Sequence, residues 1–268
     1  TVVPLSVQMF MRLLLLFFLF VIPLCSQAQY AETIRTGRPG AAIGAHTTGS
    51  KVFQVQTGVN FGRNSWDPNQ KLPNSQSVTV MRYGLLERLE VSAVVGLSRV
   101  KWSQLEQYDF DQKGLSAAQI GFRVNLRDGQ GKGPNIGIQS RLKLNVLDED
   151  FEQQRLASAH LLAVTQKLTP QLGLAANIGL STTGNEDENP SGIYVLNLNT
   201  MVNQKISVFI ENYGTFGQQF NSKFDTGLGY LINNDLQLDA SVGYGKNDGV
   251  QDMFVDFGLS WRTVGSRD

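Results

Sequence analysis

The chain has 268 residues and a formal net charge of zero, because 23 lysine and arginine residues balance 23 aspartate and glutamate residues. This balance argues against a nucleic-acid-binding protein and against a disordered acidic arm. The length permits one large domain or two small ones. The slightly negative mean hydropathy does not exclude a membrane barrel, whose strands carry polar residues at every second position.

Residues 9–28 have the pattern of a secretory signal peptide. Arg12 precedes an apolar run from Leu13 to Leu24, and Ser26-Gln27-Ala28 supplies the small residues that signal peptidase reads. The run is too short to cross a bilayer as a helix, so an N-terminal membrane anchor is the less favoured alternative. We expect residues 1–28 to be upstream residues plus a cleaved signal peptide.

Cys25 lies within this leader, so the mature chain would have no cysteine. That excludes a disulfide-stapled small fold and a cysteine metal cluster. Residues 29–50 show neither strand nor helix periodicity. We expect this irregular segment either to lie in the periplasm or to enter the lumen of the domain that follows.

From residue 51 to residue 262, apolar and polar residues alternate with a period of two, which indicates β-strands. Many of the segments are about nine to eleven residues long, the length at which a tilted strand crosses a bilayer. The predicted strands, twelve in number, lie near residues 53–61, 77–86, 89–97, 118–127, 136–146, 155–166, 172–180, 192–200, 205–214, 223–231, 236–244 and 253–261. Residues 263–268 would form a short C-terminal tail.

Short and long connections alternate along the chain. Short links are predicted at 86–88, 128–133, 167–170, 201–204 and 232–235, and longer polar links at 62–75, 98–114, 147–154, 181–192, 215–222 and 245–251. Outer-membrane barrels have short periplasmic turns and longer extracellular loops. An even number of strands would place both ends of the barrel in the periplasm.

Two architectures fit the alternation, a membrane barrel and a secreted soluble β-protein. Long strands, aromatic residues near the ends of the apolar face, and a polar face that mixes glycine and serine with charges favour the barrel. Closure also removes the open strand edges that lipid does not tolerate. The predicted fold class is therefore all-β, a transmembrane antiparallel up-and-down β-barrel of about twelve strands over residues 51–262.

Several short motifs occur in an order that resembles a known family. They are Thr36-Gly-Arg-Pro-Gly40, Phe53-Gln-Val-Gln56, Met81 to Glu90, Phe209-Ile-Glu211 with Tyr213-Gly214, and Asp235 to Asp239. Together they resemble the MetA-pathway of phenol degradation family of outer-membrane barrel proteins. The resemblance implies a transporter of small, hydrophobic or aromatic solutes. In relatives an acidic residue is expected where Gly37 stands.

The last strand, with Asp256, Gly258 and Trp261, has the polar, glycine and aromatic spacing of a barrel-assembly signal, although an ordinary amphipathic strand fits as well. The expected partners are outer-membrane lipid, lipopolysaccharide, the barrel-assembly machinery and a small-molecule solute, without nucleic acid. Neither a cofactor nor a metal is expected.

Residues that could carry catalysis are few. His46 lies in the irregular N-terminal segment, and Ser158 and His160 share one strand face without an acid or amide partner. A hydrogen-bonded wall histidine is the default interpretation, so no enzyme is expected. Glu186-Asp187-Glu188 in a long link could bind a divalent cation that bridges lipopolysaccharide, or could be an ordinary solvated loop.

Charged residues on the polar face form two groups. The predicted basic lumen-lining group is Arg123, Arg127, Arg141 and Lys143, and the acidic group is Glu211, Asp225, Asp239 and Asp256. In a ring of this size the two groups would face each other and set up a field that orients dipolar solutes. Alternatively, the charges pair across the lumen and close it, and Arg35 and Arg38 could fold inside to pair with the acidic side.

The sequence thus predicts an outer-membrane channel for passive passage of small solutes. The alternatives are a non-transporting structural barrel and a lipid-modifying outer-membrane enzyme.

Overall fold

A computed structural model of the chain describes residues 31–67, 70–104, 108–129, 133–185, 189–217, 219–247 and 249–263. The predicted signal peptide, the Glu186-Asp187-Glu188 run and all but the first residue of the predicted tail lie outside this part. Among the described residues, no helix is long and apolar enough to cross a membrane.

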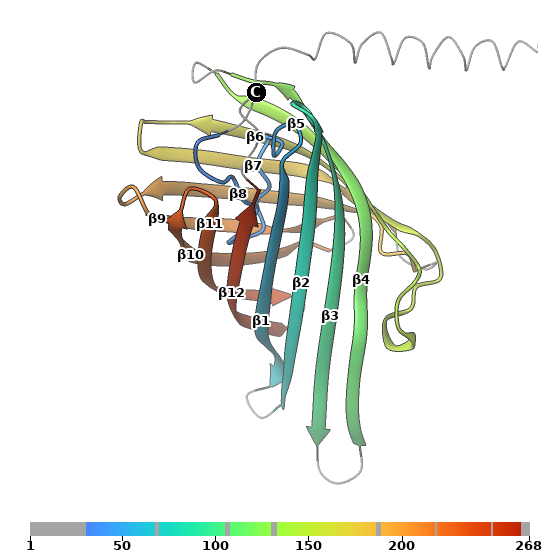
Figure 1. Cartoon of the computed structure of the whole chain (residues 1–268). Coiled ribbons are helices and arrows are strands. Elements are labelled where there is room, and N and C mark those ends of the chain that lie inside the picture. The colour runs from blue at the N-terminus through green and yellow to red at the C-terminus, as the bar shows by residue number, and fades with distance from the viewer. Residues whose placement is uncertain are drawn as a thin grey trace, which may run out of the picture.

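The described strands form one closed antiparallel barrel in which each strand pairs with its sequence neighbours and β1 pairs with β12 (Figure 1). The strands are β1 (Phe53–Asp67), β2 (Gln70–Leu86), β3 (Leu89–Gln104), β4 (Tyr108–Arg127), β5 (Asn135–Lys143), β6 (Ala157–Lys167), β7 (Leu172–Ser181), β8 (Ser191–Met201), β9 (Ile206–Phe216), β10 (Asn221–Asn233), β11 (Leu236–Asn247) and β12 (Val250–Arg262). A short 3-10 helix, η2 (Glu149–Phe151), lies between β5 and β6. The predicted fold class and strand number are confirmed.

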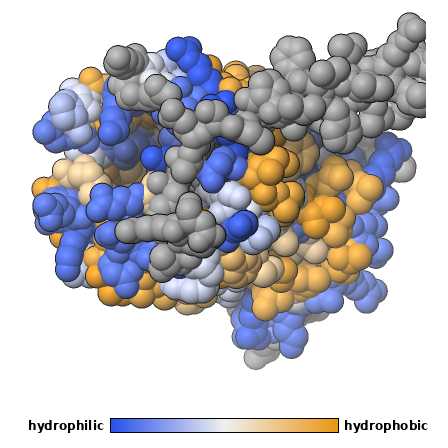
Figure 2. All heavy atoms as spheres, turned by 45° about the horizontal axis from the view of Figure 1, so that its top comes forward, coloured by the Kyte–Doolittle hydropathy of each residue, from blue (hydrophilic) through white to orange (hydrophobic). Residues whose placement is uncertain are grey.

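The apolar face of the strands points outward. Leu97 and Phe257 are 55% and 53% exposed, whereas Gln54 and Glu90 on the opposite face are 1% exposed. Figure 2 shows the resulting broad hydrophobic area on the outer wall. Buried polar and exposed apolar side chains invert the pattern of a soluble protein, because the outer surface contacts lipid and the interior is polar.

The first two extracellular hairpins, β1–β2 and β3–β4, are longer than predicted. The sequence predicts polar loops at 62–75 and 98–114, but the strand pairing continues to Asp67 opposite Gln70 and to Gln104 opposite Tyr108. The ladder depends on backbone hydrogen bonds, so it continues where the outward side chains change from apolar to charged. β3 and β4 therefore project beyond the other strands (Figure 1).

β4 also extends past the end of its neighbour β5, which leaves part of its edge without a strand partner. One carboxylate at the start of η2 and one within it cover this edge: Asp148 Oδ2 accepts the N–H of Leu115 at 2.6 Å, and Asp150 Oδ2 accepts the N–H of Lys113 at 3.1 Å. Side-chain acceptors here satisfy backbone donors that would otherwise form an open edge.

The short connections at 87–88, 168–171, 202–205 and 234–235 all lie at one end of the barrel, which by the rule for outer-membrane barrels is the periplasmic end. The start of β1 and the end of β12 lie at the same end, since Thr263 N donates to Phe53 O at 2.8 Å.

Candidate functional site in the lumen

Residues 31–52, here called the lumen segment, lie inside the barrel (Figure 1, in blue). Ala45 and Val52 are almost completely buried although no strand contains them. Ile34 N donates to Asn234 O at 2.7 Å, and Lys51 N donates to Gly84 O at 2.8 Å. Both carbonyls are beside periplasmic turns, so the segment enters and leaves through the periplasmic mouth.

On one side of the lumen, Arg38 joins the segment to acidic residues of the wall. Its guanidinium forms an ion pair with Asp256 and lies 3.2 Å from Asp239 Oδ1. It rests against Gly58 and Gly258, which are directly paired between β1 and β12. The two glycines leave the room that the guanidinium occupies, since a Cβ at either position would overlap it.

We expect Gly258→Ala to loosen the lumen segment. The added methyl group would lie 2.6 Å from Asp239 Oδ1 and overlap the Arg38 guanidinium, at a cost of about 1–3 kcal/mol. Trypsin cleavage after Arg35 in the reconstituted barrel should then be about tenfold faster. Gly44→Ala is the control, because its nearest neighbour would be 4.0 Å away. Equal cleavage rates in both variants would contradict this role of Gly258.

Next to this ion pair, a buried carboxylate binds the backbone of the segment. Glu211 accepts the N–H groups of Ala41 and of Ala42, the latter at 3.2 Å, and also the side-chain N–H of Asn197 at 2.9 Å. Charge-assisted hydrogen bonds of this kind are stronger than neutral ones. Glu211 therefore holds the turn that follows Arg38.

Asn177 on β7 binds the segment as a neighbouring strand would. Its Oδ1 accepts the N–H of Ile43 at 2.8 Å, and its Nδ2 donates to the carbonyl of Ile43 at 2.9 Å. One amide side chain thus satisfies both backbone groups of a residue that has no strand partner.

On the opposite side, buried arginines donate to carbonyl groups of the segment. Arg82 Nη1 donates to Arg35 O at 3.3 Å, and Arg123 Nη1 donates to His46 O at 3.2 Å. Asn125 Nδ2 adds a hydrogen bond to Ala45 O at 3.0 Å. Here the wall supplies donors, whereas around Glu211 it supplies acceptors.

Glu90 balances part of this positive charge. Its carboxylate accepts two hydrogen bonds from Arg82, at 2.8 and 2.7 Å, lies 3.6 Å from Arg123 Nε, and accepts the N–H of Thr48 at 2.9 Å. All three charged side chains are about 95% buried or more. The group is therefore a desolvated ion cluster that also holds the segment.

The structure places the predicted basic residues in three different settings. Arg123 belongs to the buried cluster. Arg141 and Lys143 lie nearer the extracellular end of β5, beyond the lumen segment. Both are half-buried, and Arg141 rests across Gly121 of β4. Arg127 is separate and exposed: an irregularity between Asn125 and Arg127 puts it opposite Ile136, at the periplasmic end of β4. The bulge therefore removes Arg127 from the predicted row.

The predicted acidic residues lie together. Asp225 is directly opposite Glu211 across the β9–β10 pair, and both are buried. Asp239 and Asp256 flank Arg38. The sequence prediction missed Arg82, Glu90 and Asn177, which are buried polar residues at inward strand positions; the strand alternation itself was the signal that could have found them.

His46 of the lumen segment faces Arg35, Arg123 and Asp128. Burial, followed by the charge of Arg35, lowers the pKa of His46 to about 4. His46 is therefore neutral near pH 7, which suits a residue whose backbone carbonyl oxygen already accepts hydrogen bonds from two guanidinium groups.

A cavity of about 240 Å³ remains beside the segment, at the periplasmic ends of β5–β8. Its lining includes His46, Thr165, Lys167 and Asn199. The lumen segment thus leaves a small cavity of mixed polar and apolar lining between itself and the periplasmic ends of β5–β8.

Residues 36–263 match the model of the family described as "Putative MetA-pathway of phenol degradation". The chain belongs to this family. The match covers the lumen segment from Thr36 onward and all the strands, so the family assignment includes both parts of the lumen site. No curated protein sequence matches this family member.

Solved structures share the fold of this phenol-degradation family member at low sequence identity. The COG4313 outer membrane channel from Pseudomonas putida F1 aligns with a TM-score of 0.69 and 11% identity over 86% of this chain and 100% of that chain. The translocator domain of the autotransporter NalP from Neisseria meningitidis aligns with a TM-score of 0.51 and 13% identity over 78% and 88%. Both are outer-membrane barrels, and the present barrel is likewise one of the Gram-negative outer membrane.

Ser158 shares a strand with His160 but is not its hydrogen-bond partner. His160 Nδ1 is 2.7 Å from Ser140 Oγ on the neighbouring strand, on the outward face, whereas Ser158 contacts Thr182. Among the described residues, no acid or amide hydrogen-bonds to the His160 ring. The pair satisfies two polar side chains on an otherwise apolar face.

Proposed function

We propose that this barrel is a channel for passive passage of small solutes across the outer membrane, with the lumen segment setting the width of the path. The observation that carries this proposal is the cavity that stays open at the periplasmic ends of β5–β8, beside a segment that is held by specific side-chain hydrogen bonds. A twelve-stranded barrel is narrower than a porin of 16–18 strands, and the segment narrows it further. Large hydrophilic solutes are therefore excluded.

The charges that remain available favour anions. Asp239 and Asp256 face Arg38, Glu211 is occupied by backbone N–H groups, and Asp225 is buried opposite Glu211. By contrast, Arg141 and Lys143 make no hydrogen bond or ion pair within the described part of the chain. Both lie on the extracellular side of the lumen segment. The predicted transverse field is thus replaced in our proposal by a basic vestibule that attracts small organic anions, including aromatic ones as the family description suggests.

Replacing Arg141 and Lys143 with glutamine should lower the preference for anions. The substitutions remove two positive charges from the vestibule, so the chloride-to-potassium permeability ratio should fall by about twofold or more. Reversal potentials across planar bilayers under a potassium chloride gradient measure this ratio. Lys205→Gln, in the exposed β8–β9 turn, is the matched control. Unchanged selectivity in the double variant would rule out the basic vestibule.

Solute uptake by liposomes that contain the purified barrel tests the channel itself. Uptake of small aromatic carboxylates, with exclusion of larger sugars, is the expected result. No uptake and no conductance would leave the structural barrel as the better account. Release of fatty acid from phospholipid, abolished by Ser140→Ala, would favour the lipid-modifying enzyme instead.

We also propose that the barrel-assembly machinery inserts the chain and that lipopolysaccharide surrounds it.

A further inference from the structure

Basic residues mark the extracellular edge of the apolar outer face on β1, β3 and β4. The last outward apolar residues are Phe61, Leu97 and Leu115, and the next outward positions are Arg63, Arg99 and Lys113. Lys101 follows Arg99 on the same face of β3. The four cations, here called the basic rim (Arg63, Arg99, Lys101 and Lys113), are all exposed.

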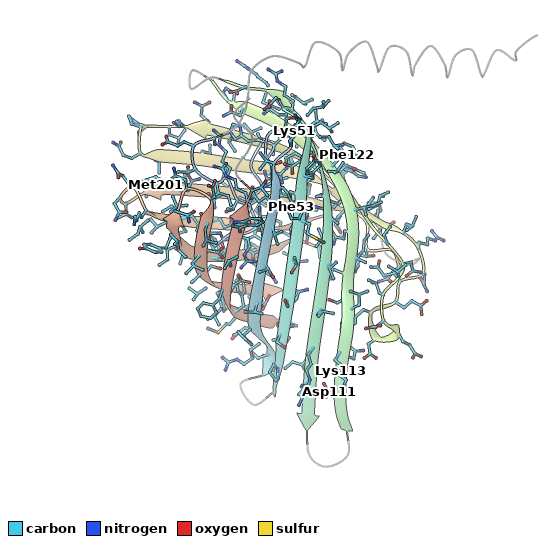
Figure 3. All side chains as sticks on the ribbon, viewed as in Figure 1. Lys51, Phe53, Asp111, Lys113, Phe122 and Met201 are labelled. Atoms are coloured by element: carbon cyan, nitrogen blue, oxygen red, sulfur yellow. The ribbon has the colours of Figure 1, made fainter. Side chains whose placement is uncertain are left out.

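Three of the four cations lie on the β3–β4 hairpin, and Arg63 lies on β1, with β2 between it and β3. Arg99 and Lys113 are directly paired across the β3–β4 ladder, where neighbouring strands are about 4.8 Å apart. Lys113 and Asp111 lie at the end of the barrel opposite Lys51 (Figure 3). The basic rim therefore lies at the level of the lipid headgroups of the outer leaflet.

Two grooves in the lipid-facing surface lie next to the basic rim, on the side toward the middle of the membrane. One, of about 590 Å³, runs over β10–β12 and β1; Phe224, Tyr244 and Met253 line it, and Arg63 is at its edge. The other, of about 260 Å³, runs over β1–β3 with Arg99 at its edge. Each groove has mainly apolar walls toward the middle of the membrane and ends at a guanidinium on its extracellular side.

The smaller groove arises from small side chains on β2. Ser77 lies directly between Val59 on β1 and Leu97 on β3, and Ser75 lies between Phe61 and Arg99. Serine is much shorter than its neighbours, so the surface is hollowed along β2. A hollow about one side chain wide, with apolar walls, fits an acyl chain.

Carboxylates nearby neutralise only part of this charge. Asp111 accepts two hydrogen bonds from Arg99, at 2.8 and 2.6 Å. Asp148 and Asp150 lie beyond the other edge of β4, where they accept backbone N–H groups. Among the described outward positions of these rows, four cations therefore face one carboxylate.

We propose that this face of β1–β4 and β10–β12 is a binding site for lipopolysaccharide, with phosphate groups on the basic rim and acyl chains in the two grooves. Lipopolysaccharide combines phosphates with several acyl chains in one molecule, and guanidinium and ammonium groups are the usual protein partners of phosphate. The site is on the outer wall, so it is independent of the proposed channel.

The test is a titration of the purified full barrel in detergent with lipopolysaccharide, followed by a mobility shift on native gels. Lys101→Gln with Lys113→Gln should weaken binding by about tenfold, since each cation near an anionic lipid surface contributes appreciably and the Arg99–Asp111 pair stays intact. Lys51→Gln with Lys205→Gln, at the periplasmic end, removes the same charge and should leave binding unchanged.

Two further variants separate charge from shape. Asp111→Asn removes the one described carboxylate of these rows and should tighten binding. Ser77→Leu fills the smaller groove without changing any charge, and should weaken it while the barrel keeps its heat-dependent migration on gels. Equal binding by the rim variant and its periplasmic control, or equal binding to phosphatidylglycerol vesicles and lipopolysaccharide, would overturn the proposal.

Discussion

Replacing Arg38 and Glu211 with glutamine together is expected to raise the single-channel conductance of the reconstituted barrel by about threefold or more. The two residues supply the charge-assisted contacts that hold residues 38–42 against β9, β11 and β12. Each such contact contributes roughly 1.5–3 kcal/mol. Without them the middle of the lumen segment is released, while the strand ladder stays intact.

The wall side of the same contact gives an independent check. Asp239→Asn with Asp256→Asn removes the partners of Arg38 and should also raise the conductance, by less than the first double variant, because Glu211 still holds Ala41 and Ala42. Lys205→Gln should have no effect, because Lys205 is exposed in a turn. Wild-type conductance in both double variants would mean that the segment does not limit the path.

Glu90→Gln is expected to lower the free energy of unfolding of the barrel by about 3 kcal/mol or more. Arg82 and Arg123 are buried beside Glu90, and the substitution leaves both guanidinium groups without their counter-charge. Removing one partner of a buried ion pair is strongly destabilising because it leaves an uncompensated charge in the interior. Urea titration of the membrane-inserted protein, followed by tryptophan emission, measures the difference.

An exposed ion pair serves as the comparison for Glu90. Arg99 and Asp111 are similarly close, but both are exposed on the outward face of the β3–β4 hairpin. Arg99→Gln with Asp111→Asn should therefore leave the urea midpoint unchanged, because water and salt screen the pair. A loss as large as that of Glu90→Gln would show that burial is not the cause.

The membrane-spanning strands could be predicted because lipid imposes a strict alternation on each of them, as on β11 from Leu236 to Tyr244. The same rule fails outside lipid, which is why the ends of β1 to β4 were predicted as loops. Arg127 was misplaced because a single-residue bulge reverses the side to which a side chain points.

The conformation of the lumen segment could not be obtained from local sequence. It has no periodicity, and its contacts join residues that are far apart in the chain, such as Arg38 with Asp256. The sequence suggested Arg38 as an alternative partner for the acidic residues, and the structure places it there. The exact set of donors, Arg82, Asn125 and Asn177, depends on the closed ring of strands.

Both ends of the lumen segment lie at the periplasmic mouth, beside Asn234 and Gly84. The segment thus enters the lumen as a loop from the periplasmic side, and it does not pass through to the extracellular side. It can be withdrawn by a pull from the periplasm, and can return, while the β1–β12 seam stays closed. Mechanical removal of the segment then requires that its hydrogen bonds and the Arg38 ion pairs break, while the strand ladder in the bilayer stays intact.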